Sequence, residues 1–192
     1  MSEFVITTVD DARRMLHWLT KRRRTTLTSL VRAAEMRSSA LVNFGSLDEA
    51  ARRTNDTNLG LILQVVSGND HRVIARPAGA KHLQTKPVNG GVPLEIRAAG
   101  GGLLEIPLEK IEDVRVLART MEAANNCSLT AICTKAGVSL GMVSYVNGVV
   151  EQNDLRLRTS LEVFLAGGFE LAVQPCFANA REARFAAKVA DR

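Results

Sequence analysis

The chain has 192 residues, 46% hydrophobic and 23% charged, which excludes a disordered polymer and fits one domain or two small ones. The net charge of +5 and the isoelectric point of about 9.5 suit a polyanionic partner such as nucleic acid. Most of this excess lies in residues 1–77, with twelve Lys and Arg against eight Asp and Glu. No apolar run has the length of a membrane span, the N-terminus lacks a signal-peptide pattern, and the three cysteines form no CxxC pair, so we expect a cytoplasmic protein.

The N-terminal half begins with an alternating, β-branched run over Phe4–Val9, which predicts a strand. A helix follows from Asp10, with acidic residues at its positive end, and it runs into a basic cluster. Arg22, Arg23 and Arg24 are candidate phosphate contacts just before the next motif. The alternative is a solvated helix end whose charge complements the helix dipole.

Residues 26–45 have the spacing of two short helices joined by a turn, a helix-turn-helix. The second helix of this motif is shaped to enter the major groove of DNA. Its exposed start and outer face are expected to comprise Arg37, Ser38, Ser39, Ala40 and Asn43. The Asn43 side chain would pair with adenine, and the alternative is that the Ser and Asn side chains only cap and solvate the helix.

The rest of this half predicts two more helices, from a capping box at Ser46–Glu49 and from an apolar stripe over Asn58–Ser67. A β-rich strand, His71–Pro77, closes it. Residues 78–91 have no apolar period and contain Pro, Gly and Lys, which is typical of a linker. A flexible coil of that length spans roughly 20 Å, and about 50 Å when extended, which includes one turn of DNA at about 34 Å.

The C-terminal half repeats this order of elements. Val92–Arg97 and Leu103–Leu108 are expected to pair as a hairpin around a glycine-rich turn, and Ile111–Asn125 is expected to be a helix. After a second helix-turn-helix, Asp154 is expected to cap another helix, and the strand Phe169–Pro175 follows.

The second helix-turn-helix, Ser128–Gly148, has Gly137 in its turn, where a left-handed backbone angle favours glycine. Ser139 is placed to cap the second helix, and Val143 and Val146 are expected to point inward. The residues expected to contact DNA are Ser139 and the outer face, which comprises Leu140, Gly141, Ser144, Tyr145 and Asn147. Candidate phosphate contacts at the starts of the two first helices are Thr28, Ser128 and Thr130.

The two motifs align without a gap, residues 26–44 on residues 128–146. Glu35 of the first motif occupies the position of Gly137 in the second. A left-handed turn at that position is less favourable for glutamate than for glycine. Because the surrounding elements also recur in the same order, the alignment indicates a duplicated module.

Residues 135–148, KAGVSLGMVSYVNG, are similar to the helix-turn-helix of the Cro and lambda-repressor superfamily. Over nearly its full length the chain resembles the immunity repressors of temperate mycobacteriophages. The motif is moderately specific in the second copy and weak in the first, which lacks the turn glycine. The resemblance implies an N-terminal helix-turn-helix domain, a C-terminal second DNA-binding domain, and a lysogeny repressor that binds short asymmetric operator-like sites, called stoperators.

We therefore predict a mainly α protein with small β-hairpins, in which two tandem helix-turn-helix modules, residues 1–77 and 92–192, are joined by the linker 78–91. Two unlike recognition helices predict sequence-specific binding of an asymmetric double-stranded DNA site by a monomer, with repression by occupancy. In one alternative only the N-terminal module binds DNA, and the C-terminal module, with a helix over residues 177–192, dimerises or holds a partner. Another alternative is an architectural binder without sequence preference.

The histidines His17, His71 and His82 are isolated from other metal-ligating side chains in the sequence. The chain has no HExxH motif, no nucleophile elbow and no phosphate-binding glycine loop. We therefore expect no enzymatic activity, no cofactor and no metal.

Overall fold

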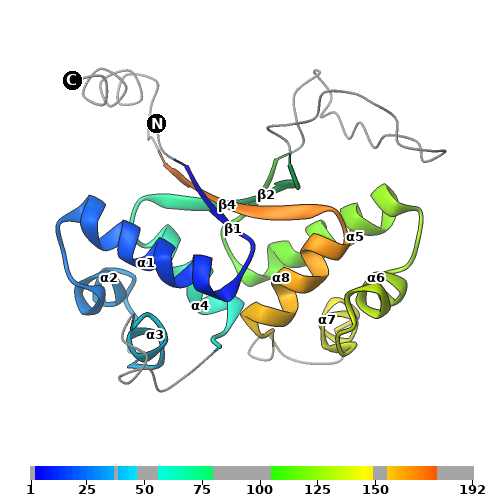
Figure 1. Ribbon diagram of the computed structural model, residues 1–192, viewed down its shortest axis with the longest axis horizontal. Coiled ribbons are helices and arrows are strands. Elements are labelled where there is room, and N and C mark those ends of the chain that lie inside the picture. The colour runs from blue at the N-terminus through cyan, green and yellow to red at the C-terminus, as the bar shows by residue number, and fades with distance from the viewer. Residues whose placement is uncertain (1–2, 37–38, 47–55, 80–104, 149–154, 177–192) are drawn as a thin grey trace.

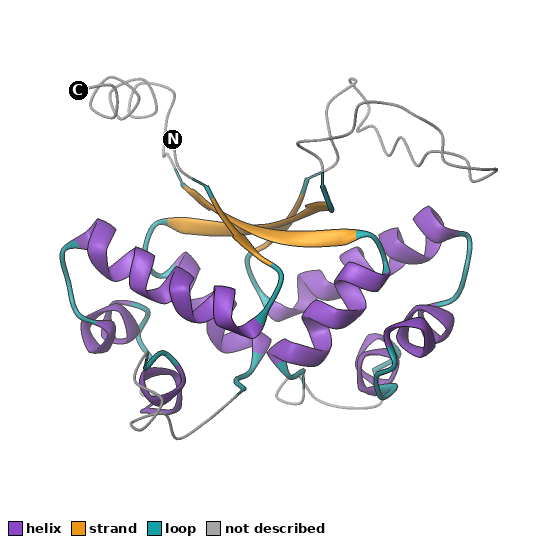
Figure 2. Ribbon diagram, viewed as in Figure 1, coloured by secondary structure: helices purple, strands orange, loops and turns teal. Residues whose placement is uncertain are grey.

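The computed structural model describes residues 3–36, 39–46, 56–79, 105–148 and 155–176. These residues form eight α-helices, one short 3-10 helix and one four-stranded antiparallel sheet. The sheet is one layer, and the helices cover one of its faces (Figures 1 and 2). The segments expected as a helix over 47–54, a strand over 92–97 and a helix over 177–192 lie outside the described residues.

The first half contains a strand, four helices and a second strand. They are β1 (Phe4–Ile6), α1 (Val9–Arg23), α2 (Leu27–Ala33), α3 (Ser39–Phe44), α4 (Leu59–Ser67) and β2 (His71–Pro77). Helix α1 begins at a capping box, in which Asp11 accepts hydrogen bonds from the backbone and hydroxyl of Thr8. Burial alone would raise the pKa of Asp11, but the hydrogen bonds from Thr8 and Thr7 outweigh it and lower that pKa.

The second half repeats this order. Its elements are β3 (Ile106–Leu108), η2 (Ile111–Asp113), α5 (Val114–Asn125), α6 (Leu129–Ala136), α7 (Gly141–Val146), α8 (Leu157–Ala166) and β4 (Phe169–Pro175). The local details recur as well. Asp113 accepts the Lys110 backbone N–H at 3.0 Å, as Asp11 does for Thr8. The helices α1 and α5 both end at a residue with left-handed backbone angles, Arg24 at φ 50° and Asn126 at φ 48°.

The sheet has the strand order β1-β4-β2-β3, and every pairing joins a strand of one half to a strand of the other. No described strand pairs with a described strand of its own half, and residues 92–97, the expected hairpin partner of β3, lie outside the described residues. The central strands explain this, because Val73 and Ala75 of β2 are buried in the core and β2 needs a paired neighbour on both edges. A single neighbouring strand can pair with only one edge of β2, so β2 pairs with β3 on one edge and with β4 on the other.

One hydrophobic core extends through both halves. The same cluster of buried side chains includes Leu16 and Leu59 from the first half and Leu117 and Leu157 from the second. The two halves share a sheet and a core, and residues 80–91 of the expected linker lie outside the described residues. The helix expected after Asp154 is present as α8, but its N-cap is Arg156 and not Asp154.

Candidate nucleic-acid interface

The residues expected to form the first helix-turn-helix form α2, a turn and α3. The Thr26 hydroxyl caps α2 by accepting the Ser29 backbone N–H at 3.2 Å. In the turn, Glu35 has φ 55°, a left-handed angle that is strained for a residue with a Cβ atom. Leu41 and Phe44 bury the inner face of α3.

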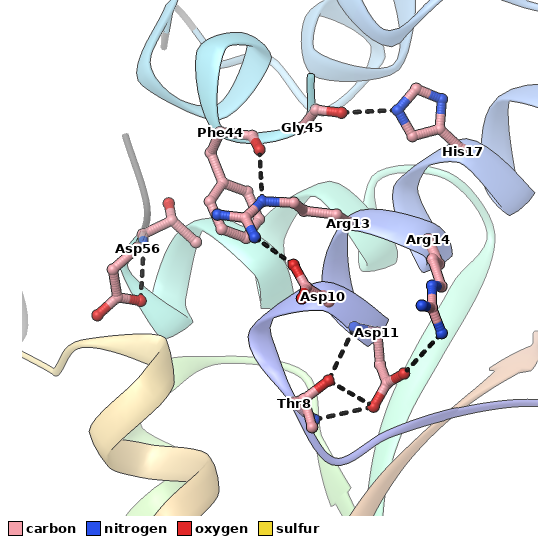
Figure 3. A network of polar contacts seen from close by, with 10 residues as sticks. Thr8, Asp10, Asp11, Arg13, Arg14, His17, Phe44, Gly45 and Asp56 are labelled. Carbon is pink, nitrogen blue, oxygen red and sulfur yellow. Dashed lines mark hydrogen bonds and ion pairs between the residues drawn. The ribbon is translucent and has the colours of Figure 1, made fainter. Parts of the chain in front are cut away.

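Two side chains of α1 hold the C-terminal end of α3 (Figure 3). Arg13 Nε donates to the Phe44 carbonyl at 3.1 Å, and the Arg13 guanidinium lies 4.7 Å from the Phe44 ring centroid. His17 Nε2 donates to the Gly45 carbonyl, 2.6 Å away. The Arg13 guanidinium is almost fully buried and is paired with Asp10. These contacts fix α3 on the body of the protein and leave its opposite side exposed.

The residues expected to form the second helix-turn-helix form α6, a turn and α7. Its turn residue Gly137 has φ 69°, the same left-handed region that Glu35 occupies in the first unit. The Arg115 guanidinium lies 5.1 Å from the Tyr145 ring centroid. This stacking repeats that of Arg13 on Phe44, so in each half an arginine of the preceding long helix packs on an aromatic ring of α3 or α7.

The expected outward orientation of Tyr145 is wrong. Its side chain is 1% exposed, and its hydroxyl donates to the Ile111 carbonyl at 3.2 Å. Burial raises the pKa of the Tyr145 phenol. The inner face of α7 is formed by Met142 and Tyr145, whereas Val143 is only half-buried.

A difference of one residue between the two turns explains this error. Phe44 follows Glu35 by nine residues, but Tyr145 follows Gly137 by only eight. The gapless alignment placed Phe44 on Val146, and the structure places it on Tyr145. The outer faces therefore correspond as Asn43 to Ser144 and as Ala40 to Gly141.

The cap assigned to Ser139 is also wrong. Helix α7 begins at Gly141, its N-cap residue is Leu140, and no side chain makes a capping hydrogen bond there. In α6, by contrast, the Ser128 hydroxyl accepts the Ala131 backbone N–H at 3.3 Å. Ser139 is exposed in the turn.

The remaining candidate DNA contacts are at the surface. The exposed ones are Thr28, Ser39, Ala40, Ser128, Thr130, Leu140, Gly141 and Asn147, and the half-buried ones are Asn43 and Ser144. Leu140 is 47% exposed, which is unusual for a large apolar side chain in this fold. Arg37 and Ser38 lie outside the described residues. Both α3 and α7 lie at the end of the molecule away from the sheet (Figure 1).

The basic cluster at the end of α1 contacts other parts of the first half. Arg22 lies over the Trp18 ring, 5.3 Å from its centroid. Arg23 pairs with Asp70 at 2.6 Å and donates to the Asn69 carbonyl. Arg24 is exposed and ends the helix. The contacts of Arg23 direct its side chain to the turn before β2 and not to α3.

Sequence reasoning did not identify two arginines at the start of α8, Arg156 and Arg158. Both are exposed, and the start of α8 lies between α3 and α7 in Figure 1. The backbone of Arg156 forms an isolated bridge with Asn58, and the Arg158 backbone N–H donates to Asp56 Oδ1 at 3.2 Å. No local sequence signal distinguishes these arginines, because only the fold brings them between the two motifs.

The described residues contain no group of three or more His, Cys, Asp or Glu side chains that could hold a metal ion. Within the same part of the chain, no helix combines the length and the apolar character needed to cross a bilayer. A comparison with protein-family models, with curated proteins and with solved structures finds no match.

Proposed function

We propose that this protein is a sequence-specific double-stranded DNA-binding repressor, and that one chain binds DNA through two unlike recognition helices, α3 and α7. In the resemblance described above, the regulated process is phage lysogeny and immunity. Repression then follows from occupancy of a site that polymerase must bind or pass.

One observation carries the proposal. The second helices of both helix-turn-helix units lie at the same end of the molecule, and their outer faces are exposed, uncharged and partly hydrogen-bonding. Ser39 and Asn43 on α3 differ from Leu140 and Ser144 on α7, so the two helices would read different bases. Short, uncharged side chains on a helix that enters the major groove are suited to base contacts, while phosphate contacts need cations nearby.

Such cations are present at the same end of the molecule. Arg156 and Arg158 are exposed at the start of α8, and in Figure 1 the start of this helix lies between α3 and α7. A cation there meets the phosphates of the DNA segment between two contacted grooves and adds affinity without sequence preference.

The fully buried Tyr145 is not a suitable position for a mutation that tests DNA contact, because truncation of its side chain would disturb the fold.

The test is selection of binding sites from random double-stranded DNA by the full-length protein, followed by affinity measurement on the enriched and on scrambled duplexes. We expect one enriched site, bound at least a thousandfold more tightly than scrambled DNA at physiological salt. Light scattering of the complex should give one chain per site. Equal affinity for scrambled DNA would identify an architectural binder instead.

The matched pair Asn43→Ala and Ser144→Ala separates two-unit binding from the alternative in which the C-terminal half dimerises. Both side chains are half-buried and occupy corresponding positions of α3 and α7. If both units read DNA, each change weakens binding to the enriched site about tenfold or more and leaves affinity for scrambled DNA unchanged. If Ser144→Ala has no effect and two chains occupy each site, the dimerisation alternative is correct.

A further inference from the structure

The two halves are related by a two-fold rotation. Strands β2 and β4 pair antiparallel over their whole length, and the middle residue of each, Ile74 and Ala172, are partners. The edge strands follow the same rotation, because Phe4 of β1 pairs with Val173. In the same manner Ile106 of β3 pairs with Ala75 of β2.

A second point on this axis lies at the other end of the molecule. The Leu59 backbone N–H donates to the Leu155 carbonyl at 3.0 Å, and the Leu157 N–H donates to the Thr57 carbonyl at 2.8 Å. These reciprocal bonds join the starts of α4 and α8. The axis therefore runs from the centre of the sheet to this bridge, and α3 and α7 lie on opposite sides of it (Figure 1).

The separation of α3 and α7 is fixed by these contacts and not by the linker. All three strand pairings of the sheet join one half to the other. The backbone bridge between the starts of α4 and α8 joins the halves again at the opposite end of the molecule. Side chains of both halves fill one core. A rigid body of this kind can place its two recognition helices at only one distance and in one relative orientation.

A two-fold axis also dictates the strand direction of the two half-sites. The strands of a DNA duplex are antiparallel, so a rotation that exchanges the two protein units exchanges the two DNA strands as well. Each unit then reads its half-site in the same 5′ to 3′ sense, on opposite strands. Units on a flexible linker would also accept direct repeats and variable spacing, whereas these units would not.

We infer that this chain reads two inverted half-sites of unequal base sequence, on one face of the duplex and at one fixed spacing. The inference rests on the proposed function and specifies its DNA ligand. A spacing of one helical turn, about 10 base pairs between half-site centres, matches the two-fold arrangement of helix-turn-helix pairs on DNA. The inequality follows from the outer faces, where Ala40 and Asn43 correspond to Gly141 and Ser144.

The experiment uses the full-length protein and the site enriched from random DNA. Fluorescence anisotropy compares the enriched duplex with one in which one half-site is reversed to a direct repeat, and with one lengthened by five base pairs at its centre. We expect both changes to reduce affinity at least tenfold, to the level of a duplex with one half-site. Unchanged affinity for the direct repeat or for the lengthened duplex would overturn the inference while the proposed function stands.

The variants Asn43→Ala and Ser144→Ala give an independent measurement. For each variant, base substitution at the base pair that the missing side chain contacted should no longer change the binding affinity. The two base pairs identified in this way, one for each variant, should lie at equal distances on opposite sides of the site centre. If both base pairs lie in the same half-site, the inference is overturned. Failure to enrich any site would instead overturn the proposed function, so the two failures are distinguishable.

Discussion

The Tyr145 hydroxyl donates a hydrogen bond to the Ile111 carbonyl, 3.2 Å away, and this bond joins helix α7 to the start of the helical segment that supports it. Ile111 is the first residue of η2, which continues into α5. The same tyrosine ring lies under the Arg115 guanidinium. The phenol therefore holds α7 from within the core, and it is not part of the exposed face of that helix.

The change Tyr145→Phe tests this role. It keeps the ring and its stacking on Arg115 but removes the hydroxyl donor from a buried carbonyl. We expect the free energy of unfolding in urea to fall by about 1 kcal/mol, because a buried hydrogen bond contributes about that amount. Base preference should be unchanged where the variant is folded. A variant of full stability with altered base preference would instead assign Tyr145 to the DNA interface.

Replacement of Arg156 by Ala should weaken DNA binding without changing sequence preference. The slope of log affinity against log salt should decrease by about one, because one phosphate contact and its released counterion are lost. The matched control is Arg72→Ala, since Arg72 is exposed on the sheet and donates to Gln174 there. If Arg72→Ala reduces the salt slope as much as Arg156→Ala does, the loss of net charge alone explains the weaker DNA binding.

The strained turn of the first unit predicts an increase in stability on substitution. Glu35 has φ 55° where its counterpart Gly137 has φ 69°. Glu35→Gly should raise the free energy of unfolding by about 0.5–1 kcal/mol, because the left-handed conformation disfavours a Cβ atom. Gly137→Ala should lower it by about 1 kcal/mol for the same reason. Urea denaturation of both variants measures this, and a loss of stability in Glu35→Gly would contradict it.

Stability should also depend on pH through His71. This histidine is buried in β2, its ring lies edge-on to Trp18 with centroids 5.4 Å apart, and its Nδ1–H donates to the Asn69 carbonyl at 2.7 Å. Burial lowers the pKa of His71 below its ordinary value of 6.5, and the charges of Arg22 and Arg23 lower it further.

A lowered native pKa means that the unfolded chain binds the proton more readily. The contribution of His71 is therefore fully present above pH 6.5 and is lost as the pH falls below it, by up to about 1.4 kcal/mol per pH unit. Urea unfolding at pH 7.5 and pH 5.5 measures the change. His71→Gln should remove this part of the pH dependence, and an equal pH dependence in that variant would assign it to other groups.

Several features of this fold could be predicted from the sequence because they depend on local patterns. The strands His71–Pro77 and Phe169–Pro175 have the predicted bounds, and the helix predicted over Ile111–Asn125 is present as η2 and α5. The turn angle of Glu35 follows from its place opposite Gly137. The alternation of apolar and polar residues, the helical period and the capping residues each lie within a short stretch of sequence. A single sequence is therefore sufficient to recognise them.

The missed features depend on contacts between distant residues. The pairing of β1 with β4 joins Phe4 to Val173, and no local pattern encodes that partnership. The orientation of α7 was mispredicted because the second turn is one residue shorter, and in a helix a shift of one residue rotates the outer face by about 100°. The burial of Tyr145 and the stacking of Arg115 on its ring reveal this shift.

The exchange of strands between the halves has a consequence for gene dosage. A symmetric repressor made of two subunits must assemble before it binds, so at low concentration its occupancy rises with the square of protein concentration. This chain already contains both units in one sheet, and on the proposed monomeric binding its occupancy rises only in proportion to concentration. A twofold fall in protein concentration would then halve the rate of rebinding to an empty operator, whereas an assembling dimer would lose three quarters of that rate.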